Sequence, residues 1–110
     1  MTFLSELRVA DKARDAEWRE KVGAESLPTL FRATELGGEV GELLNIVKKL
    51  ERERLGWSGK RDTLEHLREE IGDVMICLDL LAMQYEIDIE EAAREAFNKV
   101  SDRIGLSQKL

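Results

Sequence analysis

The sequence is poor in the residues that build disulfide frameworks, thiolate metal sites and domain linkers. Its 110 residues include one cysteine, Cys77, and one proline, Pro28. A single cysteine excludes an intrachain disulfide and a cysteine-rich zinc site. Because no segment rich in proline, glycine or serine interrupts the chain, we expect a single domain spanning residues 1–110.

Long apolar runs and basic clusters are also missing. No stretch reaches the ~18 apolar residues of a transmembrane helix, and the longest candidate, residues 74–83, contains Asp79. The N-terminus has no basic segment followed by an apolar run, so it does not resemble a signal peptide. The net charge of −6 and the lack of a Lys/Arg block argue against duplex nucleic acid or an anionic membrane as a partner. We expect a soluble, cytoplasmic protein.

The pattern that is present is helical. Strand-like alternation is absent, and apolar residues recur at intervals of three and four. The four segments with this pattern are 2–21, 26–54, 62–85 and 88–103. Ser26 is the expected N-cap of the second segment, Asp62 or Thr63 of the third, and Asp88 of the fourth. The short connections predict an all-α, antiparallel four-helix bundle.

The third segment is apolar almost all round between Val74 and Met83. A helix of this kind is buried on every side, and four helices of one small chain rarely enclose one of their own. A short chain also buries a limited core by itself. We therefore expect the bundle to be completed by oligomerisation.

Two pairs of acidic residues interrupt the apolar faces of the second and third segments. At about 100° per residue, Glu39 lies on the apolar side of its helix with Glu42 at the border, and Glu70 and Asp73 lie on the apolar side of the next. An uncompensated buried carboxylate is costly, and four that converge repel one another. A divalent cation that prefers oxygen ligands offsets both effects. These residues predict a Mg²⁺ site, with Mn²⁺ as a substitute.

Other interpretations of the acids have to be weighed. A single Glu-x-x-Glu in a chain with 23 acidic residues is normally surface charge, which would suit a non-catalytic helical interaction module. Two such motifs on adjacent helices, each with a glycine between its acids, favour metal binding. A di-iron bundle needs Glu-x-x-His on two helices, but Thr63 stands three residues before the only histidine, His66. We expect His66 to pair with Glu70 one turn on.

The order and spacing of the acids resemble a known family. Glu39-x-x-Glu42 followed by Glu70-x-x-Asp73 is similar to the metal signature of the MazG-like, all-α nucleoside triphosphate pyrophosphohydrolases. The segments that carry the resemblance are GEVGELLN at 38–45, EEIGDVMICLDLLA at 69–82, IDIEEA at 87–92 and FNKVSDRIGL at 97–106.

The resemblance implies a fold, an assembly and an activity. The fold is an all-α bundle whose helices pack across subunits, as a homodimer or homotetramer. The activity is Mg²⁺-dependent hydrolysis of a (deoxy)nucleoside triphosphate to the monophosphate and pyrophosphate, in nucleotide-pool house-cleaning. By the same resemblance, the metal-binding and catalytic acids are Glu39, Glu42, Glu70 and Asp73, with activation of the attacking water as the alternative role of one of the glutamates.

Further residues are candidates for substrate binding. Asn98 and Lys99 match positions on the fourth helix that lie near the phosphates in related proteins. Lys48 and Lys49 are predicted phosphate ligands, the alternative being the solvated end of a helix. Trp18 is predicted to stack on the base, because an aromatic face accepts any base. The alternative for Trp18 is a core or interface anchor.

Overall fold

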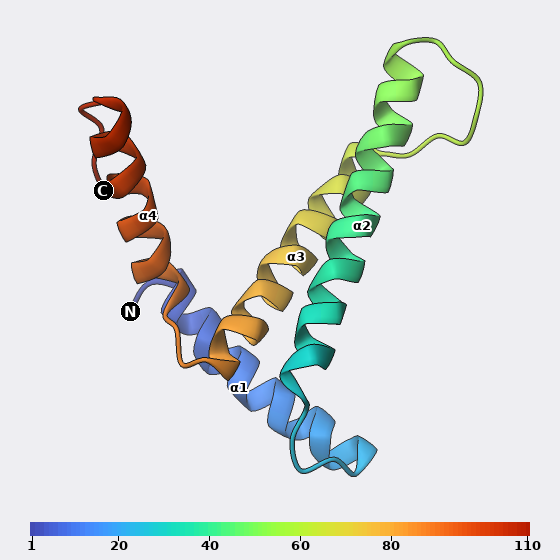
Figure 1. Ribbon diagram of the computed structural model, residues 1–110. Helices are drawn as coiled ribbons and strands as arrows, with labels where there is room; N and C mark the ends of the chain where they lie inside the picture. The colour runs from blue at the N-terminus through green and yellow to red at the C-terminus, as the bar shows by residue number, and fades with distance from the viewer.

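The computed structural model describes residues 1–110 as four α-helices without any strand (Figure 1). The helices are α1 (Phe3–Val22), α2 (Thr29–Arg54), α3 (Leu64–Gln84) and α4 (Ile89–Ile104). All four predicted segments are confirmed, with boundaries shifted by a few residues. None of the helices combines the length and the apolar content needed to cross a bilayer.

Short polar side chains cap the N-termini of two helices as predicted. The Thr63 side chain accepts a hydrogen bond of 3.1 Å from the backbone N–H of His66 at the start of α3. One Asp88 oxygen accepts from the backbone N–H groups of Glu90 and Glu91, at 2.9 and 3.1 Å, at the start of α4. These bonds satisfy N–H groups that have no partner within the helix.

The predicted cap of α2 is wrong. Ser26 lies outside the helix, and the N-cap position is occupied by Pro28 with φ −61° and ψ 146°. Proline makes no side-chain cap, but its ring already fixes φ at a suitable value, and the N–H it lacks would have had no intrahelical partner. Helix α2 therefore begins at Thr29.

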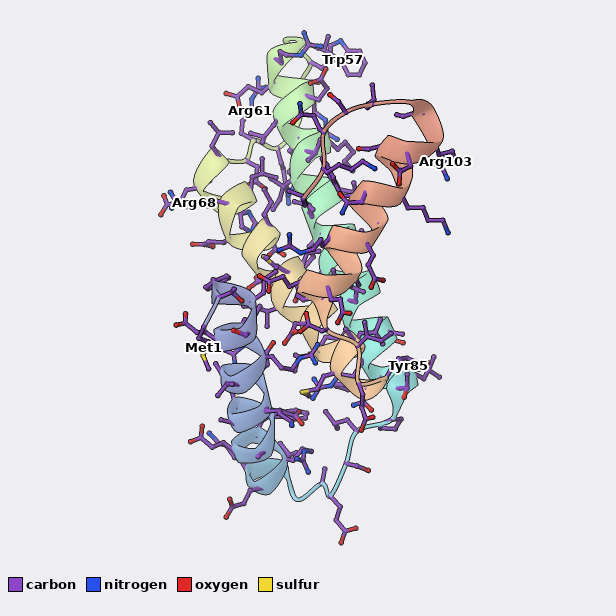
Figure 2. All side chains as sticks on the ribbon, turned by 90° about the vertical axis from the view of Figure 1, so that its left-hand side faces the viewer. Met1, Trp57, Arg61, Arg68, Tyr85 and Arg103 are labelled. Atoms are coloured by element: carbon purple, nitrogen blue, oxygen red, sulfur yellow. The ribbon has the colours of Figure 1, made fainter.

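Helices α2 and α3 form an antiparallel hairpin, and the other two helices are arranged around its lower end in Figure 1. Helix α1 packs against the C-terminal half of α3, near the start of α2. Helix α4 leaves the hairpin and packs mainly against α1. The loop between α2 and α3 carries Trp57, at the end of the hairpin opposite to Tyr85 (Figure 2).

One chain encloses little apolar surface. Ile46, Cys77 and Leu80 are its only buried hydrophobic residues, and the molecule extends over 48 × 46 × 25 Å. Met75 and Leu78, in the segment expected to be buried on every side, are 39% and 45% exposed. The four helices are confirmed, but they do not close into a bundle within a single chain.

Candidate metal centre

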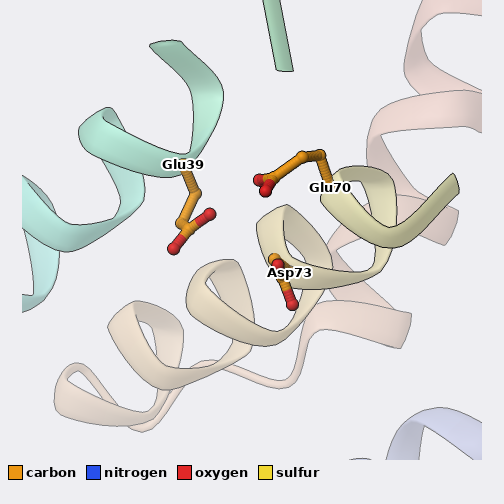
Figure 3. Close-up of side chains that lie close together, drawn as sticks. All are labelled: Glu39, Glu70 and Asp73. Atoms are coloured by element: carbon orange, nitrogen blue, oxygen red, sulfur yellow. The ribbon is translucent and has the colours of Figure 1, made fainter. Parts of the chain in front are cut away.

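Three of the four predicted acids meet inside the α2–α3 hairpin (Figure 3). Glu39 comes from α2, whereas Glu70 and Asp73 come from α3, one turn apart. One carboxylate oxygen of each lies within 4.8 Å of the others. Glu70 is buried, Glu39 is half-buried and Asp73 is exposed. The cluster is therefore closed on the side of the hairpin core and open to solvent at Asp73.

Two buried carboxylate oxygens of this cluster have no protein donor. The buried Oε2 atoms of Glu39 and Glu70 accept no hydrogen bond from any protein group. A hydrogen bond with Glu70, burial, and the negative charges of Glu70, Glu42 and Asp73 raise the pKa of Glu39 to about 7. Without a cation, the acids lower their mutual repulsion by retaining a proton between them.

This set of donors fits a hard divalent cation. All three ligand atoms are carboxylate oxygens, the ligand type that Mg²⁺ prefers, and two of the three residues carry an unpartnered buried oxygen. Softer ligands are not in the set. Burial raises the pKa of the neighbouring Cys77 thiol to about 11, which keeps it neutral. A cation would offset the repulsion that now favours a retained proton.

Glu42 stands beside the cluster and outside it. Its side chain is exposed on α2 and contributes no oxygen to the group that lies within 4.8 Å. Its negative charge is still close enough to help raise the pKa of Glu39. Four acids were expected to converge, and three do so in this arrangement.

A cavity of about 200 Å³ opens between α1, α2 and α3. Its lining residues are Asp11, Arg14, Asp15, Trp18, Arg32, Glu35 and Leu80. Glu35 precedes Glu39 by four residues, so both lie on the same face of α2. The cavity is thus one helical turn away from the acidic cluster.

Arg32 organises the wall of this cavity. Its side chain is only 4% exposed, and it pairs with Asp15 of α1 and with Glu35 at 3.2 Å. Arg19 holds the other Asp15 oxygen at 3.0 Å. Sequence reasoning missed this network, because its charges come from separate helices. The available signal was Arg32 itself, a charge four residues before Leu36 on the apolar face of α2.

Trp18 lines the same cavity from α1. Its ring centroid lies 6.2 Å from that of Phe31, with the two planes tilted by 30°. Because 41% of Trp18 is exposed, it is not a core anchor within the single chain. Its aromatic face is accessible beside the cavity.

The lysines of α2 do not reach the cluster. Lys48 is exposed, and Lys49 Nζ lies 3.7 Å from Asp62 at the start of α3. Asp62 also accepts a contact of 2.8 Å from His66 Nδ1, and this hydrogen bond raises the pKa of the imidazole. The predicted pairing of His66 with Glu70 is present at 3.8 Å, so His66 has a structural explanation.

The two predicted residues of α4 lie away from the cluster in a single chain. The Asn98 side chain donates to the Leu110 carbonyl at 3.1 Å and accepts from the Leu110 N–H at 2.8 Å, which fastens the C-terminal segment to α4. Lys99 is exposed on the same helix. Since α4 packs mainly on α1, these residues are not brought to the acids by this fold.

Comparison with known proteins gives one informative result. Residues 30–104 match the family model of the MazG nucleotide pyrophosphohydrolase domain. The match begins after α1 and covers α2, α3 and α4, including the acidic cluster. No match was found among curated protein sequences or among solved structures. Because the matched segment covers more than half of the chain, the protein belongs to the MazG nucleotide pyrophosphohydrolase domain family.

Proposed function

We propose that the protein is a Mg²⁺-dependent pyrophosphohydrolase that converts a (deoxy)nucleoside triphosphate and water to the monophosphate and pyrophosphate. The observation that carries the proposal is the pair of unpartnered buried oxygens on Glu39 and Glu70, beside the exposed carboxylate of Asp73. The family match supports the reaction class. The cellular role that we propose is nucleotide-pool house-cleaning in the cytoplasm.

The acids divide into two roles in this proposal. Glu39, Glu70 and Asp73 would hold Mg²⁺, or Mn²⁺ in its place, because their oxygens converge. A bound divalent cation supplies charge neutralisation on the phosphates and lowers the pKa of water. Glu42 is not engaged in the cluster, so it is free to accept a proton from the attacking water.

The cavity beside the cluster is our candidate for the nucleoside. Trp18 offers an exposed aromatic face on which a base can stack. Arg14 and Arg32 contribute positive charge to the lining. With the base near Trp18, the phosphates would extend along α2 past Glu35 towards the cluster.

We also propose a homodimer or homotetramer. Large apolar side chains are exposed on α3 and α4, and they include Ile71, Met75, Leu78, Phe97 and Val100. A second copy would cover these surfaces and increase the buried apolar area, which is small in one chain. The same association is our proposed route for Asn98, Lys99, Lys48 and Lys49 to contact phosphates of a substrate.

A product analysis tests the reaction class. We would incubate the protein with Mg²⁺ and each of the common ribo- and deoxyribonucleoside triphosphates, and separate the products. Release of monophosphate and pyrophosphate is expected, and it should be lost in Glu70→Gln but kept in Glu69→Gln, which changes the adjacent exposed acid in the same way. Diphosphate with orthophosphate, or no product from any substrate, would reject the proposal in favour of an interaction module.

A further inference from the structure

A pair of acids is also buried outside the candidate metal centre. Asp79 of α3 is fully buried and Asp11 of α1 is 2% exposed. The Oδ2 atom of each has no hydrogen-bond partner, and the two carboxyl groups lie close enough for a hydrogen bond between them to help raise the pKa of Asp11. Two adjacent carboxylates in a dry interface repel each other, so a hydrogen bond between them requires that one holds a proton.

The surrounding charges favour Asp11 as the protonated member. Arg8 Nε donates to Asp79 Oδ1 at 2.9 Å, a charge-assisted hydrogen bond. Asp11 has weaker support, because the exposed Arg14 lies 3.7 Å away and Arg32 is already paired elsewhere. Burial and the neighbouring Asp79 raise the pKa of Asp11 to about 7, against the opposing effect of the two arginines.

Other titratable groups around the pair do not supply a positive charge that would take the place of the shared proton. The Cys77 thiol of α3 is neutral, since burial raises its pKa to about 11. Asp88, at the start of α4, lines a small cavity together with Arg8 and Asp79 and adds negative charge. Loss of the shared proton therefore leaves two buried carboxylates with Arg8 at 2.9 Å from Asp79 and only the exposed Arg14, at 3.7 Å, beside Asp11.

The pair lies where α1 is attached to the rest of the fold. Helix α1 packs chiefly on α3, and Arg8 extends the attachment by donating to the Ile87 carbonyl at 2.5 Å. Asp11 itself lines the cavity, and Asp15 and Trp18 follow it on the same side of α1. Any loosening of α1 at Asp11 would therefore move a wall of that cavity.

We propose that Asp11 and Asp79 are positioning residues, whose shared proton docks α1 on α3 and thereby holds Trp18 at the cavity. With the proton present, α1 packs on α3 and its side chains line the cavity. When the proton is lost, repulsion between the carboxylates loosens α1. The docking of α1 is independent of any reaction, and only the consequence for substrate affinity rests on the function proposed above.

Hydrogen exchange of the protein tests the docking directly. Protection of the amides of residues 3–22, corrected for intrinsic exchange, is expected to fall about tenfold relative to α2 and α3 between about pH 6 and about pH 8.5. Asp11→Asn should keep α1 protected at every pH, because its amide donates to Asp79 permanently. Glu20→Gln changes an exposed acid of the same helix and should behave like the wild type.

Two results of the exchange experiment would contradict the proposal. Constant relative protection of α1 in the wild type, or an unchanged pH response in Asp11→Asn, would overturn the proposal. Should Asp11→Asn fail to fold, the pH dependence of α1 protection in the wild type tests the proposal by itself. Trp18 fluorescence against pH, in a Trp57→Phe background, provides a second measurement.

Kinetics then test the link to the cavity. The KM for the nucleotide is expected to rise with pH in the wild type but not in Asp11→Asn. A change confined to kcat would refute the link between α1 and the cavity. Absence of hydrolysis in every protein would reject the proposed function but leave the exchange result intact.

Discussion

Glu39 and Glu70 reach towards each other from α2 and α3, and each carries a buried oxygen without a hydrogen-bond partner (Figure 3). Buried polar atoms are nearly always paired, so two unpartnered oxygens in one place support our proposal that a cation binds here. Asp73 completes the set of three oxygens and leaves it open to solvent. In the function that we propose, a divalent cation would satisfy these oxygens, and a nucleotide would approach from the open side.

Neutralising the cluster should remove activity without unfolding the protein. In Glu70→Gln or Asp73→Asn, one oxygen ligand becomes an amide and the negative charge is lost, so we expect a loss on the order of a hundredfold or more in kcat/KM. Helical circular dichroism should be unchanged, since repulsion within the cluster is relieved. Full pyrophosphate release at saturating Mg²⁺ by either variant would show that the site is assigned wrongly.

Adding Mg²⁺ should stabilise the fold. A ligand that binds only the folded state at about a hundred times its Kd adds about 2.7 kcal/mol, and we expect Tm to rise by several degrees. Mn²⁺ should act in the same way, whereas the double variant Glu39→Gln/Glu70→Gln should not respond. Equal melting curves with Mg²⁺ and with a chelator would favour the interaction module.

Removing Arg32 should destabilise the protein. Arg32→Ala leaves Asp15 and Glu35 without their shared partner beside the cavity, and breaking such a buried pair costs about 3–5 kcal/mol in the free energy of unfolding. Chemical denaturation measures this loss. Arg54→Ala is the matched control, because Arg54 pairs with Glu51 on an exposed face and should have little effect.

Truncating Trp18 should weaken substrate binding. If a base stacks on its ring, Trp18→Ala loses about 1–3 kcal/mol of binding energy, which corresponds to a KM increase of about 5-fold to about 150-fold. Trp18→Phe should recover part of it, while Trp57→Ala, at the far end of the hairpin, should leave KM unchanged. Equal KM values in the wild type and Trp18→Ala would place the base elsewhere.

Asp11 should make stability depend on pH in a defined direction. Its pKa rises from 3.8 to about 7 on folding, so the folded state binds a proton that the unfolded state releases. This contribution is complete below pH 3.8 and is lost as pH rises through about 7. Denaturation of the wild type and Asp11→Asn across this range should show it. The difference between the profiles isolates Asp11, since Glu39 is present in both; parallel profiles would contradict the assignment.

Much of the local structure was predictable because its causes are local. The period of apolar residues defines the four helices. The side chains of Thr63 and Asp88 cap their helices by accepting hydrogen bonds from N–H groups at most three residues further along the chain. The spacing of Glu70 and Asp73 on one helix likewise places both on one face. The start of α2 was mispredicted because Ser26 has a good capping side chain, while the helix begins after Pro28.

Other features depend on which helices meet, and sequence periodicity does not contain this information. Arg32 and Asp15 are 17 residues apart and become partners only when α1 packs near the start of α2. Asp11 and Asp79 come together from α1 and α3, and the sequence shows each as an isolated acid. The position of Glu42 beside the cluster, and the separation of α4 from the acids in one chain, are also results of packing.

The sequence alone therefore determined the four helices, the faces that carry the acids and the resemblance to a pyrophosphohydrolase family. Hydrogen bonds and side-chain spacing within a helix act over a few residues, which is why these features can be derived from the order of amino acids. The tertiary structure decided which charges became partners, where the cavity opened and which acids converged. Those outcomes depend on how separate helices share buried surface, where burial changes the energy of every charge that it encloses.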